Sequence, residues 1–397
     1  MRVAIVGGKL QGVEAVYLAK KAGWEVVLFD MKSDVPAAEL CDQFYALDVT
    51  EVIGWIPFLR EIDLIIPALE NQEALDSLVR TANYAGVPIV FDGDAYAISS
   101  SKLCSNTIFA DAGVPAPIPW PECDFPIILK PSNASGSEGV IKLQSALEFQ
   151  QVLADKDLTG WVMEEYLEGP SYSLEVIGYL GVYKVLKITE LQMDEGYDCK
   201  RVVGSASLSD KLTKEFEQIG LILARKLNLN GIMDIETILH HGELKVLEID
   251  ARLPSQTPIS VYHSTGINML EILGEAFVEG KPWKAFDVSE KRGVIYEHIH
   301  VFDDCLEVIG EHIMADVGPL HHYLDFFGAD EALSSYSLGR TEWVATLIIT
   351  GEDCQTAWDK RGIVLQAIRK VFGIRHYYDR YPVIEESHRV IKLAAGS

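Results

Sequence analysis

The chain lacks paired cysteines, long apolar runs and an excess of positive charge, and each absence excludes a class of protein. Its six cysteines are scattered through 397 residues without a CxxC pair, so neither a disulfide framework nor a zinc site is indicated. No run reaches the roughly 18 apolar residues that a membrane span requires. A formal net charge of −25 would repel phosphate backbones and anionic lipid. We therefore expect a cytoplasmic globular protein that binds neither nucleic acid nor a membrane.

Strand and helix patterns alternate near the N-terminus, in a chain long enough for two or three domains. VAIVGG is followed by a helical stretch from Gln11 to Ala22 and by EVVLFD, and DLIIPALEN is followed by a second helical stretch from Gln72 to Ala85. This order predicts a small doubly wound, Rossmann-like domain over residues 1–97. The turn from Gly7 to Gly12 lacks the GxGxxG spacing, so dinucleotide binding is only weakly indicated.

Several polar residues follow predicted strands of this domain. They are Asp30, Asp48, Glu70 and Asn71. Ligands bind beyond the carboxyl ends of parallel strands, where a helix N-terminus also offers backbone amides to an anion. An anion site beside several acids suits an amino acid, with its carboxylate at the helix and its ammonium at the acids. Ordinary loop polarity is the alternative.

The next region carries two lysines in settings typical of phosphate contacts. Lys102 lies in the first turn of a predicted helix, where a cation gains nothing from the helix dipole. Lys130 ends a strand and opens the loop SNASGSEG, whose small residues would let backbone amides approach phosphate oxygens. This loop does not have the Walker pattern. A surface lysine and a flexible hairpin are the alternative interpretations.

The stretch from Gly231 to Arg252, GIMDIETILHHGELKVLEIDAR, is the most informative. Apolar and acidic residues alternate on both sides of His241-Gly242, which predicts two antiparallel strands joined by a turn. Glu236, Glu248 and Asp250 could then point at one metal-bound triphosphate, because Mg²⁺ takes a few carboxylate oxygens together with phosphate oxygens. The alternative is a solvated face with a surface ion pair.

Taken in order, these segments resemble the ATP-grasp superfamily over nearly the whole chain. The motifs are SKLCSNTIFADAGVPAP, ILKPSNASGSEGV, MEEYLEG and IETILHHGELKVLEIDAR. The resemblance implies an α/β fold with a Rossmann-like substrate domain (residues 1–97), a glycine-loop lid (98–175) and a C-terminal catalytic α+β domain (176–397). It also implies ATP and Mg²⁺ as cofactors and an acyl phosphate intermediate.

The resemblance further assigns roles to individual residues. The residues implied to contact phosphate are Lys102, Lys130, Ser135 and Gly136. Those implied to contact adenine are Glu164, Glu165 and Leu167. The implied Mg²⁺ ligands are Glu236, Glu248 and Asp250, and Glu248 would also contact the nucleotide. Arg252 and Lys130 would act in catalysis, Arg252 by steadying the acyl phosphate. Asp250 stands where the family usually has asparagine, and Ser171 where related ligases often carry a ribose-binding glutamate.

Within the superfamily, GGKLQGVEAVYLAKKAGWEVVLFD and MEEYLEGPSYSLEVIGY look most like ligases of pyrrolysine biosynthesis. Such enzymes form an isopeptide bond between the carboxylate of 3-methyl-D-ornithine and the ε-amine of L-lysine, which makes these two amino acids, or D-ornithine, the expected substrates. Lys9 could reach an ATP phosphate. The remaining implied contacts are Leu10 and Gln11 to the carboxylate of lysine, Glu70 and Asn71 to its α-ammonium, and Ser171, Tyr172, Ser173, Glu175 and Ser255 to the diamino acid.

Other functions stay open at this stage. One is a different ATP-grasp carboxylate–amine ligase, such as a D-alanine–D-alanine type enzyme. Another is a dinucleotide-dependent dehydrogenase or a nucleotide sensor, which would leave Glu236, Glu248 and Asp250 without a purpose. The sequence does not identify the group that takes the proton of the attacking amine, and it leaves both a monomer and a homodimer open.

Overall fold

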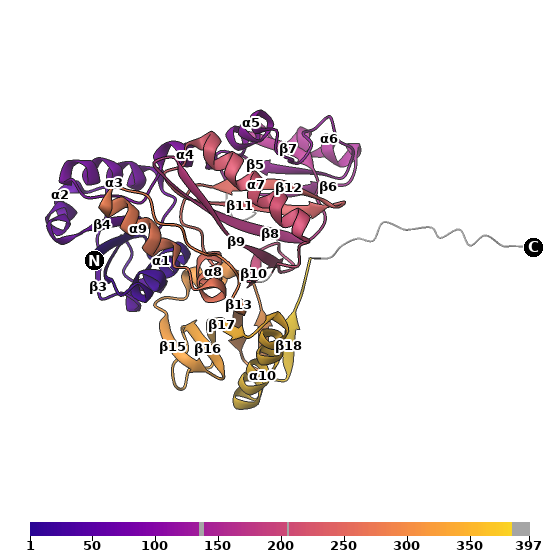
Figure 1. Ribbon diagram of the computed structural model, residues 1–397. Helices are drawn as coiled ribbons and strands as arrows, with labels where there is room; N and C mark the ends of the chain where they lie inside the picture. The colour runs from indigo at the N-terminus through magenta and orange to yellow at the C-terminus, as the bar shows by residue number, and fades with distance from the viewer. Residues whose placement is uncertain (135–138, 205, 383–397) are drawn as a thin grey trace, which may run out of the picture.

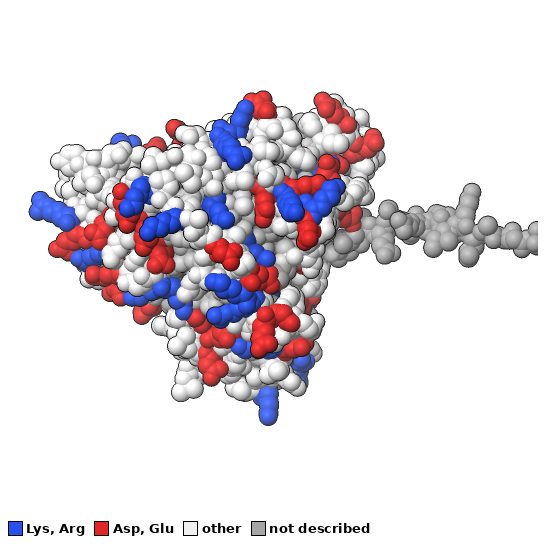
Figure 2. All heavy atoms as spheres, in the orientation of Figure 1, with Lys and Arg blue, Asp and Glu red and all other residues white. Residues whose placement is uncertain are grey.

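The computed structural model describes residues 1–134, 139–204 and 206–382 of the chain. The predicted phosphate contacts of Ser135 and Gly136 lie outside these residues. In the described part, three β-sheets carry helices on their faces (Figure 1). None of the helices described there is both long and apolar enough to cross a bilayer. On the face drawn in Figure 2, basic and acidic side chains lie interspersed.

The N-terminal domain is built on a parallel sheet with the strand order β3-β2-β1-β4. Its elements are β1 (Arg2–Val6), α1 (Leu10–Lys21), β2 (Glu25–Asp30), η1 (Pro36–Glu39), β3 (Gln43–Ala46), α2 (Val52–Trp55), η2 (Ile56–Glu61), β4 (Leu64–Pro67) and α3 (Gln72–Ala85). Gly7 has a φ of +104°, and a Cβ there would lie 2.2 Å from the Ala68 carbonyl oxygen. Only glycine therefore lets β1 turn into α1 so close to the end of β4. The predicted Rossmann-like arrangement is confirmed.

The lid is a small antiparallel sheet of order β6-β5-β7. Helices α4 and α5 connect it to the N-terminal domain. The elements of this region are α4 (Gly93–Ser99), α5 (Lys102–Ala112), β5 (Ile127–Pro131), β6 (Ile141–Leu143), α6 (Ala146–Asp155) and β7 (Trp161–Glu165). Ile127, Leu129 and Leu143 form its buried core, which is separate from the cores of the rest of the chain.

A large mixed sheet, of eleven strands within the described residues, forms the rest of the fold. Its main path is β12-β11-β8-β9-β10-β13-β17-β16-β15. Its strands and accompanying helices are β8 (Ser171–Tyr179), β9 (Val182–Met193), β10 (Cys199–Val203), α7 (Asp210–Leu227), β11 (Gly231–His240), β12 (Glu243–Asp250), α8 (Thr257–Thr265), α9 (Met269–Glu279), β13 (Gly293–Phe302), β14 (Cys305–Val308), η3 (Glu311–Asp316), β15 (His321–Phe326), β16 (Ala329–Ser334), β17 (Trp343–Gly351), α10 (Cys354–Phe372) and β18 (His376–Asp379).

The two faces of this sheet bury different partners. Helices α7 and α10 pack on one face, whereas α8 and the N-terminal domain cover the other. β8 pairs with both β9 and β11, so the predicted boundary between lid and catalytic domain at residue 175 lies inside a strand of the large sheet. The lid sheet itself ends at Glu165.

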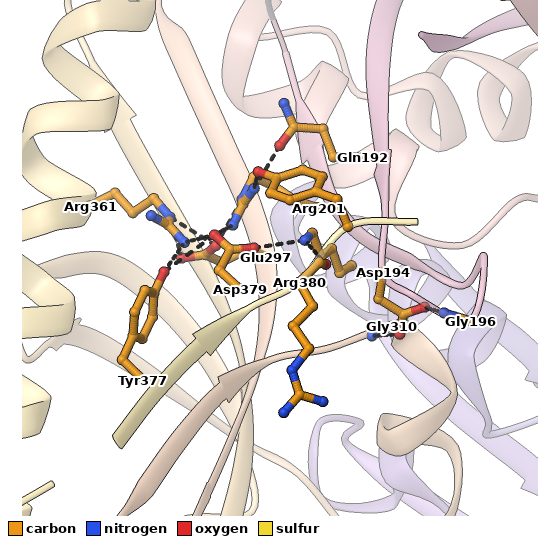
Figure 3. Close-up of polar contacts among 12 residues, drawn as sticks. Gln192, Asp194, Gly196, Arg201, Glu297, Gly310, Arg361, Tyr377, Asp379 and Arg380 are labelled. Carbon is orange, nitrogen blue, oxygen red and sulfur yellow. Dashed lines mark hydrogen bonds and ion pairs between the residues drawn. The ribbon is translucent and has the colours of Figure 1, made fainter. Parts of the chain in front are cut away.

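A buried ion-pair network ties the end of the described chain to the middle of this sheet (Figure 3). Arg201 of β10 and Glu297 of β13 are fully buried and lie 2.8 Å apart. Asp379 of β18 is 2.7 Å from Lys200, 2.7 Å from Arg201 and 3.0 Å from Arg361 of α10. One carboxylate thus faces three cations contributed by two separate elements.

We expect Asp379→Asn to lower the free energy of unfolding by about 3 kcal/mol, because breaking a buried ion pair leaves its cationic partners uncompensated. Urea unfolding followed by tryptophan fluorescence measures this change. Asp359→Asn removes an exposed carboxylate from α10 and should have little effect. Equal stability of the two variants would contradict a structural role for the network.

Candidate functional site

Acidic residues form two rows across β8, β11 and β12. The register pairs Asp234 with Glu175 on one side and with Asp250 on the other, and it pairs Glu236 with Ser173 and with Glu248. Side chains on neighbouring paired positions share a face of the sheet. The rows Glu175–Asp234–Asp250 and Ser173–Glu236–Glu248 therefore point to the same side.

A β-bulge is what brings Glu236 and Glu248 onto one face. From the turn up to Thr237, which pairs with Val246, the hairpin is regular, and the register then shifts so that Glu236 pairs with Glu248. Without the shift Glu236 would face Leu247, and Glu248 would point to the opposite face, because a slip of one residue inverts every side chain beyond it. The bulge is thus a condition for the site.

Like charges directly opposite each other are unfavourable, and this site carries several. Burial, together with neighbouring acids, raises the pKa of Asp234, Glu236 and Asp250. Asp234 is 7% exposed, and its buried Oδ1 accepts no hydrogen bond. Within the described residues no three such side chains already stand at metal-binding distances. The donors are carboxylate oxygens, which suits a hard divalent cation that takes further oxygens from a substrate.

Arg252 connects these rows to the N-terminal domain. Its Nη2 lies 2.8 Å from Asp250 Oδ2 and 2.8 Å from Glu70 Oε1. Gln11 Nε2 donates to the same Glu70 oxygen at 2.8 Å. The structure therefore brings together Gln11, Glu70, Asp250 and Arg252, which the sequence placed in two different binding sites.

The two predicted phosphate-binding lysines lie on α5 and β5. Lys102 Nζ is 3.3 Å from Glu248 and 2.5 Å from the Ala134 carbonyl oxygen, so it links the start of the glycine-rich loop to β12. Lys130 Nζ is 2.5 Å from Glu164, with side chains only 5% and 3% exposed. Both predicted phosphate contacts remain predictions, and each lysine is already oriented by a carboxylate.

The predicted adenine-binding segment begins with Glu164 and Glu165, the last two residues of β7. Glu165 accepts from Lys245 at 2.5 Å and from the Ile118 amide at 3.1 Å. Leu167 is buried. The side chain of Glu165 is therefore engaged with β12 and the lid, and the amides of Glu165 and Tyr166 donate to the carbonyl oxygens of Ile118 and Pro126. Adenine binding at this segment stays a prediction.

Other predicted residues of the N-terminal domain make local contacts. Asp30 accepts from the amides of Gly8 and Lys32 at 2.8 and 2.9 Å, and Asp48 accepts from the amide and hydroxyl of Thr50. Asn71 caps α3 by accepting from the Ala74 amide at 2.9 Å. Lys9 lies 3.3 Å from Asp316, with its side chain about half exposed. Leu10 begins α1 beside Gln11.

The predicted diamino-acid contacts divide between the two faces of β8. Ser173 and Glu175 belong to the acidic rows, and Ser171 shares their face by alternation. Tyr172 points the other way and is buried in the core beneath α7, so the structure does not bring it to the acidic rows. Ser255, in the loop before α8, donates to Glu311 at 3.0 Å.

Comparison with known proteins now decides the family. A family model described as "PylC-like, N-terminal domain" matches residues 3–90, and one described as "ATP-grasp domain" matches residues 99–256. The 3-methyl-D-ornithine–L-lysine ligase of Methanosarcina mazei is 34% identical over 94% of this chain and 96% of its own length. That of Methanosarcina barkeri is 35% identical over 94% and 98%. This chain belongs to the 3-methyl-D-ornithine–L-lysine ligase family.

Solved structures share the fold of this ligase. A Campylobacter jejuni biotin carboxylase in complex with β,γ-ATP superposes with a TM-score of 0.73 at 16% identity, covering 92% of this chain and 91% of that one. The L-amino acid ligase of Bacillus licheniformis superposes with a TM-score of 0.63 at 16% identity, covering 91% and 96%. The predicted ATP-grasp fold and the ligase class are confirmed.

Three further acids of this ligase were not singled out from the sequence. Asp234 precedes Glu236 by two positions on a predicted strand, so the alternation itself could have found it. Glu14 and Glu311 offered no such signal, because their neighbours are distant in the sequence.

Glu14 joins α1 to the first turn of α8 and to β13. It is 1% exposed and accepts from the Tyr296 hydroxyl at 2.8 Å and from the Ile259 amide, at the start of α8, at 3.0 Å. Burial raises the pKa of Glu14 to about 8, in spite of these hydrogen bonds. The helix that begins with Leu10 and Gln11 is therefore fixed to the first turn of α8.

This pKa predicts a pH-dependent stability. Between pH 4.5 and about 8 folded Glu14 keeps a proton that the unfolded chain has lost, so native stability falls as the pH rises through this window. Glu14→Gln, which mimics the protonated form, should gain up to about 1.4 kcal/mol per pH unit relative to the native protein. Thermal unfolding at pH 5, 6, 7 and 8 measures the difference.

Glu39→Gln removes an exposed carboxylate of the same domain and serves as the control for loss of one negative charge. A stability difference between Glu14→Gln and the native protein that stays constant with pH would show that Glu14 is ionised in the folded state throughout.

Proposed function

We propose that this ligase uses ATP and Mg²⁺ to join the carboxylate of 3-methyl-D-ornithine to the ε-amine of L-lysine. The observation that carries the proposal is the pair of acidic rows, joined through Arg252 to Glu70. A cation site and an amino-acid site are thereby linked by a single guanidinium. The near full-length similarity to 3-methyl-D-ornithine–L-lysine ligases supports the choice of substrates.

Cation binding at Glu236, Glu248 and Asp250 is the first part of the proposal. Mg²⁺ held there would supply charge neutralisation for the transferring phosphoryl group. Asp234 would support these ligands from the same row. The partly buried and mutually repelling carboxylates gain from any cation that they bind, which explains why so many acids are placed together without lysine partners for each.

Phosphoryl transfer is the first chemical step of the proposal. A carboxylate oxygen of the diamino acid attacks the γ-phosphorus of ATP, and the bond from that phosphorus to the bridging oxygen breaks to release ADP. Lys102 and Lys130 would hold phosphate oxygens at the junction of lid and sheet. The guanidinium of Arg252 is a permanently charged planar fork that suits an acyl phosphate or the oxyanion that follows it.

Amide formation is the second step. The ε-amine of lysine attacks the acyl carbon, inorganic phosphate leaves, and the amine loses a proton. Gln11 and Glu70 would bind the backbone groups of lysine, Glu70 taking its α-ammonium. Because Glu70 is also a partner of Arg252, lysine would be held close to the residue that steadies the acyl group.

Mass-resolved turnover tests the proposal. Purified protein with ATP, Mg²⁺, L-lysine and 3-methyl-D-ornithine or D-ornithine should yield the condensed product and ADP in equal amounts. Chelation of the metal should stop the reaction, and added Mg²⁺ should restore it. ADP release without this product would show a different acyl donor or acceptor, and a broader amino-acid screen would then identify it.

Substitution at the acidic rows tests the proposed metal site. Glu248→Gln should lower kcat by about 100-fold or more, since a lost ligand weakens stabilisation of transition-state charge, and it should raise the Mg²⁺ concentration needed for half-maximal rate. Glu243→Gln, at the exposed start of the same strand, should leave both quantities unchanged. If Glu248→Gln retained full rate at low Mg²⁺, this residue would not be a metal ligand.

A further inference from the structure

The short helix α4 lies between the N-terminal domain and α7 (Figure 1), and it is attached at both ends to the hairpin of β11 and β12. Its cap, Asp92, accepts from the Ala95 amide at 3.0 Å and from the Asn230 amide, just before β11, at 2.7 Å. At the other end, Ser99 Oγ accepts from the Ala251 amide, just after β12, at 3.0 Å. Both contacts lie at the open end of the hairpin that carries the acidic residues.

The middle of α4 is attached to the N-terminal domain. The Tyr96 hydroxyl donates to the Glu70 carbonyl oxygen at 3.1 Å. Tyr96 is 5% exposed, and its ring lies against that of Phe91 with a centroid distance of 5.4 Å. Glu70 belongs to the loop between β4 and α3, outside both elements, so its position depends on contacts of this kind. One helix therefore contacts the backbone of both domains.

These attachments meet at Arg252. Its Nη2 lies 2.8 Å from Asp250 and 2.8 Å from Glu70, whereas its buried Nε has no partner among the described residues. The shortest contacts of the guanidinium are thus both at one nitrogen. Its place therefore depends on where the backbones of Ala251 and Glu70 lie, and α4 is bonded to each of them.

The Ser99 hydroxyl is buried and uses both of its hydrogen-bonding functions. Ser99 is 7% exposed, and its Oγ donates to the Tyr96 carbonyl oxygen at 3.3 Å while it accepts from the Ala251 amide. Ala251 is 2% exposed. Without the hydroxyl, its amide would be buried without this acceptor, which is costly. The backbone between Asp250 and Arg252 would then shift toward another acceptor.

We propose that Tyr96 and Ser99 are positioning residues that act on different halves of the reaction. Tyr96 holds Glu70 in place for L-lysine. Ser99 holds Asp250 and Arg252 in place for the transfer of the phosphoryl group. The inference rests on the proposed function, from which Glu70 and Arg252 take their roles. Each hydroxyl acts through the backbone atom that it binds, so α4 keeps the two reacting groups in register.

Two assays separate these halves. In the first, hydroxylamine replaces L-lysine, and hydroxamate formed from ATP, Mg²⁺ and D-ornithine or its 3-methyl form reports the acyl phosphate alone. In the second, the condensed product is followed by mass as the L-lysine concentration is varied. Tyr96→Phe should raise the KM for L-lysine about tenfold, as expected for one lost hydrogen bond, and leave the hydroxamate rate within about twofold of native.

Ser99→Ala should affect the other quantity. The hydroxamate rate should fall about tenfold, because the backbone beside the proposed metal ligand and Arg252 is no longer fixed. The Mg²⁺ concentration for half-maximal rate should rise, and the KM for L-lysine should not. The matched controls are Ser100→Ala, the exposed serine next in the chain, and Tyr84→Phe, an exposed tyrosine of α3. Both should behave as the native protein in each assay.

The separation of the two effects is what a purely structural role would not produce. Thermal unfolding sets the assay temperature at which every variant is folded. If both variants changed the same quantity, or each changed both quantities alike, α4 would have only a structural role. If neither variant differed from native protein that forms the condensed product, the inference alone would be wrong. Native protein that forms no condensed product would overturn the proposed function and this inference together.

Discussion

The ion pairs of Arg252 are the interaction on which the site depends. The guanidinium lies between Asp250 of the large sheet and Glu70 of the N-terminal domain, 2.8 Å from each. Lys21 and Glu331 form another ion pair between the N-terminal domain and the large sheet, and the two units also share a hydrophobic core. The side chain of Arg252 is 14% exposed and that of Glu70 38%, so the loss of either carboxylate would leave a largely buried guanidinium with one partner fewer. The position of the N-terminal domain over the acidic rows and the charge balance of the rows therefore depend on each other.

The acidic rows store unfavourable electrostatic energy that ligand binding can release. Burial and repulsion raise the pKa of Asp234, Glu236 and Asp250, whereas a site evolved for stability alone would pair these acids or replace them. A cation with its phosphate ligands, and amino acids with their ammonium groups, each bring the charge that is missing. The same repulsion between acids that lowers the stability of the ligand-free fold therefore favours ligand binding.

Local patterns predicted the strands, the His241-Gly242 turn and the proposed metal ligands, because alternation is set by neighbouring residues. The bulge at Glu236 could not be predicted, although it alone puts Glu248 on the face of Glu236. Other contacts depend on long-range packing. Glu14 is hydrogen-bonded to Tyr296, 282 residues away in the sequence, and Glu311 to Ser255, 56 residues away. Tyr172 was predicted beside Ser173 by proximity in sequence, yet alternation directs it into the core.

The C-terminal subdomain, from β13 to β18, is tied to the rest of the large sheet by buried charges. Its attachment depends on β10, where Lys200 and Arg201 hold Asp379 in a network that lies largely out of water. The turn that leads into β10 supplies Asp194 and Asp198, which fix the backbone beside Glu311. A rigid attachment on one side of the strand thus positions an acid on the other. β10 lies between β9 and β13 in the large sheet, so this strand connects the C-terminal subdomain to the acidic rows on β8, β11 and β12.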